Sequence, residues 1–196
     1  MDLVLIRHPA VAVDAGVCYG ASDVALAGDA TQQAAWLAGR LAALGVREPQ
    51  RIETSPLTRC ASVAAALAGV RGQVPRAEAR LAEMDFGAWE MQRWDAIERA
   101  QIDAWAENFE HAREHGGESV AQFDARVSGW FGTLDAHEKS TVWAVTHAGV
   151  MRTVTARALG VPLAHCVRWP LEMGAIVCLH YDAPGAQWLL ARWNAW

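Results

Sequence analysis

Short runs of apolar residues alternate along this chain with longer segments in which apolar residues recur every three or four positions. A continuous apolar run such as residues 3–6 is typical of a strand covered on both faces. Residues 29–44 instead place alanine and leucine at helical spacing, and Gly45 fits the end of a helix. The patterns predict strands at 3–6, 51–54, near Val74, 141–146, 175–181 and 187–193, and helices at 29–44, 56–67, 94–108, 119–134 and 150–159.

The order of these elements predicts the fold class. Strands alternate with helices, so we expect an α/β fold: a three-layer α/β/α arrangement with a mostly parallel central sheet. Ser55 is the expected N-cap of the second helix, with Pro56 at its first position. Residues 9–25 and 111–119 contain the turn residues of loops. No linker interrupts the pattern, and we expect a single domain over residues 1–196.

Composition narrows the class of protein. The chain has 196 residues, 53% of them hydrophobic and 20% charged, which argues against disorder. A net charge of −5 gives no electrostatic footprint for nucleic acid. The four cysteines show no CxxC spacing, so reduced and mostly buried thiols are expected. No signal peptide or apolar run of about 18 residues is visible, so we expect a cytoplasmic protein without a membrane partner. The sequence does not indicate the oligomeric state.

Charged side chains follow the predicted strands where the strands end. Arg7 and His8 come directly after the first strand, and Arg59 lies about one turn into the helix after the second. His147 ends the strand at 141–146, and the amide of Ala148 begins the next helix. Each residue alone is more often structural than functional. Because ligands of open α/β sheets bind at the carboxyl ends of the strands, the set together predicts a pocket for a phosphate dianion.

Four segments carry a family resemblance. "LIRHPAV", "TSPLTRCASVAAAL", "LAEMDFGAWE" and "AVTHAGVMR" resemble, in this order, the signature segments of the histidine phosphatase superfamily, which has the phosphoglycerate mutase-like fold. The resemblance spans almost the whole chain. It implies that His8 is the phosphorylated nucleophile and that Arg7, Arg59 and His147 hold the phosphoryl oxygens. It also implies that Glu83 is the proton donor.

Elementary chemistry agrees with the roles that the resemblance implies. A neutral imidazole such as that of His8 is a good nucleophile near pH 7 when its other ring nitrogen keeps a proton. Charge on the phosphoryl oxygens requires fixed cations, which two arginines and a protonated His147 would supply. A phosphate dianion beside Glu83 should favour the protonated form of its carboxyl group, which can then act as an acid. No metal and no cofactor is required.

Further residues are candidates for substrate contact. The resemblance extends to the "HGGES" segment, which in this family covers the mouth of the site, so His115, Glu118 and Ser119 are expected to touch substrate. Tyr19, in the "CYG" segment, is a second expected contact. His111 and His115 have the spacing of metal ligands on a helix, but the neighbouring glycines favour a loop over a metal site.

Some positions are ambiguous or depart from the family pattern. Asp85 and Glu90 are rival acids close to Glu83, and Trp89 lies near them in the sequence. Most of the ten tryptophans are expected in the core or in helix packing. The family usually has Gly, Thr or Ser, and Asn where this chain has Pro9, Val11 and Asp14, and a carboxylate at 14 cannot bind a phosphate dianion.

The expected function is therefore hydrolysis of small-molecule phosphate monoesters. The "CYG" segment resembles that of α-ribazole phosphatase-like members linked to cobalamin biosynthesis, which points to α-ribazole 5'-phosphate. A phosphoglycerate mutase, a protein phosphohistidine phosphatase and a non-catalytic phosphate-binding module are the alternatives. Retention of Arg7, His8, Arg59, Glu83 and His147 argues against the binding module.

Overall fold

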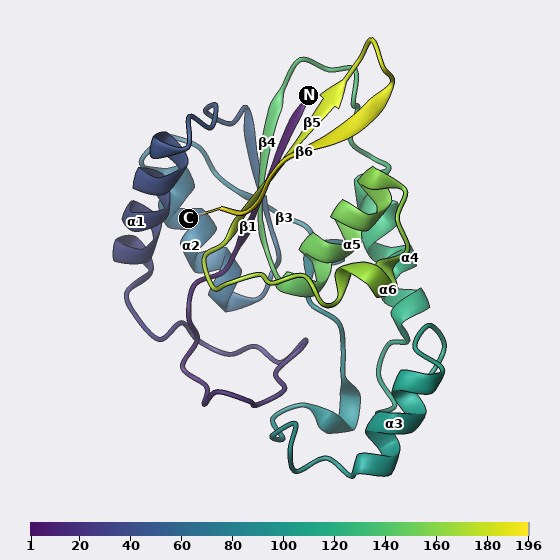
Figure 1. Cartoon of the computed structure of the whole chain (residues 1–196). Helices are drawn as coiled ribbons and strands as arrows, with labels where there is room; N and C mark the ends of the chain where they lie inside the picture. Colours follow the sequence, from purple (N-terminus) through teal and green to yellow (C-terminus); the bar gives the residue numbers. More distant parts are fainter. Residues whose placement is uncertain (196) are drawn as a thin grey trace.

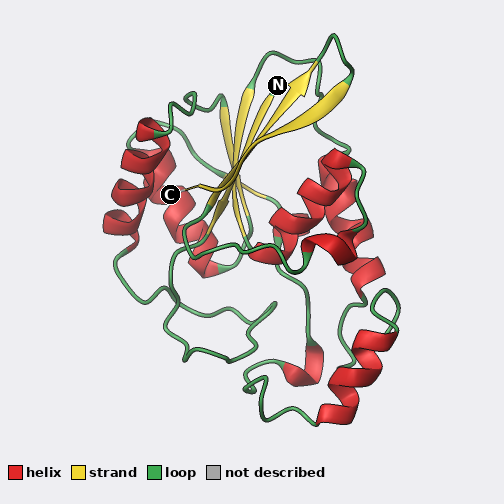
Figure 2. Cartoon of the chain, in the orientation of Figure 1, coloured by secondary structure: helices red, strands yellow, loops and turns green. Residues whose placement is uncertain are grey.

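A six-stranded sheet forms the centre of the computed structural model, which describes residues 1–195 (Figures 1 and 2). Its strands are β1 (Asp2–Arg7), β2 (Arg51–Thr54), β3 (Arg76–Ala77), β4 (Thr141–Thr146), β5 (Ile176–Asp182) and β6 (Gln187–Ala195), in the order β3-β2-β4-β1-β5-β6. The first four strands in this order run parallel, and β5 and β6 are antiparallel to their neighbours. The predicted fold class is confirmed. Residue 196, the last of the predicted domain, lies outside the described residues.

Helices cover both faces of the sheet. α1 (Ala30–Ala43) and α2 (Thr58–Gly69) lie on one face, and α4 (Val120–Phe131), α5 (Ala148–Leu159) and the short α6 (Leu163–Cys166) lie on the other (Figure 1). α3 (Arg99–Glu107) and the 3-10 turn η2 (Gly87–Trp89) extend beyond the lower end of the sheet, whereas the turn η1 (Ala79–Leu81) packs against α4.

The first strand shows how the sequence fills both layers. Successive side chains of a strand point to opposite faces. Leu3 and Leu5 pack into the cluster formed with α4 and α5, whereas Val4 and Ile6 pack into the cluster formed with α1 and α2. All four side chains are buried. A continuous apolar run is therefore required here, as the sequence pattern indicated.

The start of α2 differs from the prediction. The helix begins at Thr58 rather than Pro56, and Ser55 is not its N-cap. The Ser55 hydroxyl instead contacts the ring of His147. The first turn of α2 is capped from a distant loop, because the Asp23 carboxylate accepts hydrogen bonds from the amide and the hydroxyl of Thr58 at 2.6 and 2.7 Å.

The region between β3 and α4 also departs from the prediction. A helix was expected from residue 94, but α3 begins only at Arg99. The amide of Trp94 donates to the carbonyl of Gly16, and Arg93 forms an isolated bridge with Val17, so these residues bind the loop after β1 instead of entering the helix. The predicted strand near Val74 is two residues long and lies at Arg76–Ala77.

The predictions about the cysteines and about membrane-spanning segments can be compared with the structure. All four cysteines are free thiols; three are buried and Cys178 is half-buried, as expected. Within residues 1–195, no helix has the length and apolar character needed to cross a membrane.

Candidate active site

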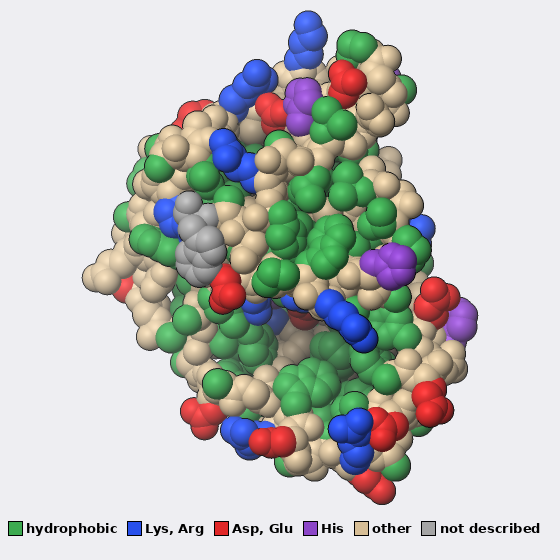
Figure 3. Space-filling view, viewed as in Figure 1, with side chains coloured by type: hydrophobic (Ala, Val, Ile, Leu, Met, Phe, Trp, Pro, Cys, Tyr) green, Lys and Arg blue, Asp and Glu red, His purple; other side chains and the backbone are tan. Residues whose placement is uncertain are grey.

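The carboxyl ends of β1 and β4 meet beside a cavity of about 440 Å³. Figure 3 shows this side of the molecule hollowed, with hydrophobic side chains around the hollow and basic side chains at its rim. Four predicted site residues line the cavity: Arg7, His8, Tyr19 and Glu83. Arg59 and His147 are completely buried close to them. The structure therefore brings the central predicted residues together.

The ring of His8 is fixed by a single hydrogen bond. Its Nδ1 lies 2.7 Å from the carbonyl oxygen of Pro9. Because a carbonyl oxygen only accepts, Nδ1 carries the ring proton and Nε2 keeps its lone pair. Burial lowers the pKa of His8 to about 3, an effect to which the charges of Arg59 and Arg7 add. The imidazole is therefore a neutral base throughout the physiological range, with its lone pair on Nε2.

Two arginines supply positive charge around His8. The buried guanidinium of Arg59 donates to the carbonyl oxygens of Gly20 at 2.6 Å and Ser22 at 2.7 Å, and Arg7 donates to the carbonyl of Leu171. Within residues 1–195 no carboxylate forms an ion pair with either arginine. In the same part of the chain, the buried Nε atoms of both side chains have no hydrogen-bond partner. Buried cations held by neutral carbonyls retain their charge for an anionic ligand.

His147 lies against His8, with ring centroids 5.2 Å apart. Its Nε2 is 2.8 Å from the hydroxyl of Ser55, and the Cys60 thiol lies 3.5 Å from the same nitrogen. Burial, followed by the charge of Arg59, lowers the pKa of His147 well below its ordinary value. The ring is therefore neutral in the unliganded site. A phosphate dianion would favour its protonation, because an opposite charge stabilises the imidazolium.

Glu83 is held at the start of α5. Its Oε2 accepts a hydrogen bond from the amide of Gly149 at 3.0 Å, and its Oε1 accepts one from Met84 at 3.1 Å. The segment carrying Glu83 is fixed to the end of β4, because the Thr146 hydroxyl donates to the carbonyl of Leu81 at 2.7 Å. The carboxyl group and His8 therefore line the same cavity although they come from distant parts of the sequence.

The two rival acids have structural contacts instead. Asp85 is exposed and accepts a hydrogen bond from the amide of Gly87 at 2.7 Å. Glu90 accepts hydrogen bonds from the amide of Ser22, at 2.6 Å, and from its hydroxyl. Neither residue is among those lining the cavity. Of the three acids, Glu83 is the one placed for proton transfer to a ligand.

The predicted contact through His115 does not agree with the structure. His115 is 2% exposed, its ring lies 4.8 Å from that of Trp89, and its Nδ1 accepts a hydrogen bond from the amide of Gly117. It is not among the residues lining the cavity, because it packs beneath the aromatic side chains next to it. Glu118 pairs with Arg126 at 2.7 Å and is likewise engaged elsewhere.

Other residues of the same loop are structural. Ser119 caps α4 through a reciprocal pair of hydrogen bonds with Gln122. His111 is exposed and lies 3.9 Å from the carboxylate of Glu110. Within residues 1–195, no group of three or more His, Cys, Asp or Glu side chains is arranged to hold a metal ion.

Tyr19 and Ala148 do lie at the site. The Tyr19 ring centroid is 6.2 Å from that of His8, and the Arg59 guanidinium lies over the tyrosine ring at 5.1 Å. Burial raises the pKa of the Tyr19 hydroxyl, which therefore stays protonated at neutral pH. Ala148 begins α5 directly after His147 and lines a second cavity that adjoins Glu83.

The structure shows what surrounds the three residues that depart from the family pattern. Pro9 binds the His8 ring through its carbonyl oxygen, which any residue at this position supplies. Asp14 is exposed and is not among the residues lining the cavity, so its carboxylate is kept from the phosphate position. Val11 is half-buried in the loop after β1.

Sequence reasoning missed Arg152. This residue lies on α5, one turn after Ala148, and lines both cavities next to Glu83. One terminal nitrogen donates to the carbonyl of Trp169 at 2.9 Å. Burial lowers the pKa of Arg152, and the charge of Glu83 opposes this shift. The spacing of four residues from Ala148 was the available signal, since residues at i and i+4 share a helix face.

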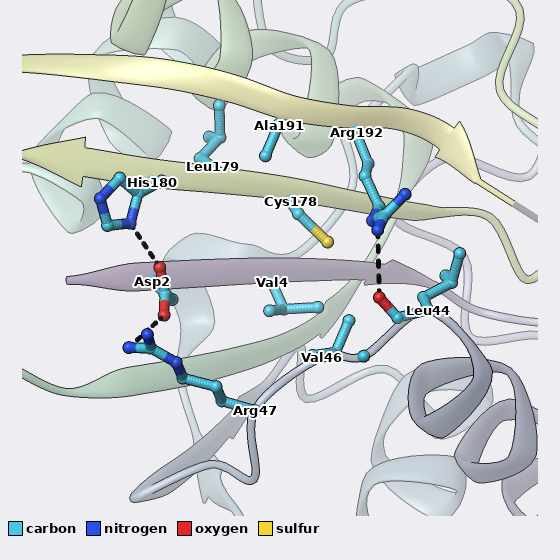
Figure 4. A pocket seen from close by; sticks show the side chains of 11 residues that line it. Asp2, Val4, Leu44, Val46, Arg47, Cys178, Leu179, His180, Ala191 and Arg192 are labelled. Atoms are coloured by element: carbon cyan, nitrogen blue, oxygen red, sulfur yellow. Dashed lines mark hydrogen bonds and ion pairs between the residues drawn. The ribbon is translucent and has the colours of Figure 1, made fainter.

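A third cavity, of about 300 Å³, lies at the other end of β1 (Figure 4). Its polar groups pair with one another: the Asp2 carboxylate binds Arg47 at 3.2 Å and His180 at 2.6 Å. The half-buried Cys178 thiol faces the same space, and burial raises its pKa to about 11, so it is not a nucleophile at neutral pH. This cavity lacks the charged arrangement found beside His8.

Known proteins resemble this chain over most of its length. A glucosyl-3-phosphoglycerate phosphatase of Mycobacterium tuberculosis is 31% identical over 182 residues, covering 78% of this chain and 76% of that protein. An adenosylcobalamin/alpha-ribazole phosphatase of Salmonella typhimurium is 31% identical over 98 residues, which is 48% of each chain. The crystal structure of the alpha-ribazole phosphatase from Shigella flexneri has a TM-score of 0.85 and 24% identity, covering 100% of this chain and 96% of that one.

A family model extends these likenesses to nearly every residue. The model of the histidine phosphatase superfamily (branch 1) matches residues 3–195, which include all four signature segments. The likeness in fold to solved phosphatases agrees with that match. The chain therefore belongs to the histidine phosphatase superfamily and is a phosphoric monoester hydrolase.

Proposed function

We propose that this chain hydrolyses small-molecule phosphate monoesters, without a metal ion, through a phosphohistidine formed on His8. The observation that carries the proposal is the state of the His8 ring. Its proton is held on Nδ1 by the carbonyl of Pro9, and Nε2 is free in a cavity flanked by arginines. A neutral, oriented imidazole beside fixed positive charge is what attack on a phosphate monoester requires.

In the first step the lone pair of His8 Nε2 forms a bond to phosphorus. The bond between phosphorus and the alcohol oxygen breaks, and its electron pair stays on that oxygen. Arg7 and Arg59 stabilise the charge on the other phosphoryl oxygens, and His147 donates to them once the dianion has favoured its protonation. Glu83 gives its proton to the leaving oxygen, so the product is a neutral alcohol.

In the second step Glu83, now a carboxylate, removes a proton from water. The water oxygen bonds to phosphorus, the bond to Nε2 breaks, and inorganic phosphate leaves. His8 is returned to its starting state, because Nδ1 has kept its proton on the Pro9 carbonyl throughout. The Glu83 carboxyl group thus acts as the acid in the first step and as the base in the second.

Trapping the intermediate tests this proposal. Rapid acid-free quenching during turnover of a radiolabelled phosphate monoester should give one base-stable, acid-labile phosphohistidine, located at His8 by peptide mapping. His8→Ala should abolish labelling and turnover of p-nitrophenyl phosphate while the circular dichroism spectrum stays native. Label recovered on His147 would show that His147, and not His8, is the nucleophile.

The names of the relatives suggest two substrates for this chain, α-ribazole 5'-phosphate and glucosyl-3-phosphoglycerate. We propose α-ribazole 5'-phosphate as the first to test, since the "CYG" segment resembles that group of phosphatases. A screen that adds 3-phosphoglycerate and a phosphohistidine peptide also tests the mutase and protein phosphatase alternatives. Formation of 2-phosphoglycerate without release of phosphate would favour a mutase.

A further inference from the structure

A second cavity, of about 180 Å³, adjoins the one that contains His8. The two share three lining residues, Glu83, Phe86 and Arg152. Glu83 therefore lies at the boundary between the nucleophile and the second cavity. Since the proposed acid must touch the leaving oxygen, the alcohol half of a substrate bound for attack by His8 would extend toward this second cavity.

The walls of the second cavity are mostly apolar, and four of the lining side chains are aromatic. Trp105 and Phe109 reach it from α3 and the residues after it, Phe123 from α4, and Phe86 from the segment after Glu83. The rings of Trp105 and Phe109 pack edge to face, with centroids 5.3 Å apart. The remaining apolar lining residues are Met84, Val120, Ala148, Gly149, Leu163 and Val167.

The size and shape of this space favour an aromatic ring. An apolar cavity of about 150 Å³ in a protein is large enough to bind benzene. The present cavity exceeds that volume slightly and is lined by four aromatic side chains, with which a further ring can make offset or edge-to-face contacts. A polyhydroxylated sugar would lose its hydration here without enough polar partners to replace it.

Three buried polar atoms on the wall have no partner among residues 1–195. They are Nε1 of Trp105, the hydroxyl oxygen of Thr153 and Nε of Arg152. Buried polar atoms in native proteins are usually hydrogen-bonded. These three atoms have almost no accessible surface, so a ligand in the cavity meets the apolar groups of the wall rather than these polar atoms.

We propose that the alcohol half of the substrate carries an aromatic ring, and that the ring binds between Phe86, Trp105, Phe109 and Phe123. The inference rests on the proposed phosphatase function and adds the chemical class of the leaving alcohol. Arg152 lines both cavities and therefore lies where that alcohol passes from one to the other.

Alkyl phosphates with matched leaving groups test this directly. Ethyl phosphate, 2-phenylethyl phosphate and 2-(indol-3-yl)ethyl phosphate release primary alcohols of similar acidity, so differences between them report binding of the appended group. We expect kcat/KM for the two aryl esters to exceed that of ethyl phosphate by more than about thirtyfold. Glycerol 3-phosphate and glucose 6-phosphate should resemble ethyl phosphate.

Variants on α3 locate the effect, because this helix has no buried residue and Trp105 packs only at the edge of the core. Trp105→Ala should lower the ratio of aryl to ethyl kcat/KM by about tenfold. Trp36→Ala removes a partly exposed tryptophan on the opposite layer and should leave the ratio as in the wild type.

The possible failures are distinguishable. If ethyl and aryl esters are hydrolysed equally well, the inference is wrong and the phosphatase function stands. A high ratio that survives both Trp105→Ala and Phe109→Ala would place the aryl group outside this cavity. If the wild-type protein hydrolyses none of the esters, p-nitrophenyl phosphate included, the proposed function itself is contradicted.

Discussion

Gly149→Ala is the substitution that most directly tests the position of the proposed acid. A Cβ atom at this position would stand 2.2 Å from Oε1 of Glu83 and 3.2 Å from a ring carbon of Phe123. Ordinary van der Waals contact begins near 3.4 Å. The Glu83 carboxyl group must therefore move by about 1 Å, and a misplacement of that size in a catalytic group costs on the order of 100-fold in rate.

The loss should depend on the leaving group. p-Nitrophenolate departs with little help from a proton, whereas an alkyl alkoxide requires one in the transition state. In single-turnover experiments Gly149→Ala should slow phosphoryl transfer from an alkyl phosphate by about 100-fold and from p-nitrophenyl phosphate by less than about tenfold. Glu83→Gln should show the same contrast, since the amide cannot donate an acidic proton. Single turnover is needed because Glu83 also acts in the second step.

Gly129→Ala is the matched control. Gly129 also lies in a helix, but a Cβ atom there would have no neighbour within 4 Å. The control should keep both rates and gain up to about 1 kcal/mol in unfolding free energy. Equal losses on both substrates in Gly149→Ala, or a leaving-group-dependent loss in Asp85→Asn instead, would refute the assignment of the acid to Glu83.

Four further predictions follow from the site. EDTA should leave kcat/KM unchanged, and activity lost on chelation and restored by a divalent cation would contradict the metal-free mechanism. Burial lowers the pKa of His8 from 6.5 to about 3, so in that pH range the unfolded chain binds one proton more and stability falls as pH falls. His8→Gln should make the slope of unfolding free energy against pH, measured with urea between pH 4 and 6, shallower by about 1.4 kcal/mol per unit; an unchanged slope would show that His8 titrates normally. Ser55→Ala removes the partner of the buried His147 Nε2 and should lower the unfolding free energy by about 1–3 kcal/mol, whereas no change in the urea midpoint would count against that bond. Pro9→Ala keeps the carbonyl that binds His8 and should change kcat/KM by less than about threefold; a large loss would mean that the proline ring itself is needed.

Elements whose pattern is set by burial could be predicted from the sequence. β1, β4 and α1 have continuous or periodic apolar residues because one or both faces enter the core. The start of α2 could not be predicted, because its cap, Asp23, comes from a loop 35 residues away in the sequence. The start of α3 is set in the same way by contacts with the loop after β1. Long-range hydrogen bonds leave no local pattern.

The same distinction holds for the site. Arg7 ends β1, and His8 and His147 directly follow buried strands, so these polar residues at strand ends are visible in the sequence. Arg152 was missed because a single arginine within a helix resembles a solvated one until the fold shows that it is half-buried beside Glu83. The aromatic cavity was missed for the opposite reason. Trp105 resembles a core residue, and only the position of α3 shows that its ring faces an open space.

The position of β1 has a consequence for how the protein is made. This strand precedes β4 and β5 in the sequence by more than a hundred residues, yet it lies between them in the sheet and pairs Asp2 with Thr141 and with His180. During translation β1 therefore remains without these partners until both strands have left the ribosome. Because non-local strand pairing is slow, its apolar side chains are exposed to chaperones and aggregation for that time. His8, which follows β1, can take its place in the site only after β4 and β5 have been synthesised, so a chain that stops before β5 lacks the arrangement on which the proposed activity depends.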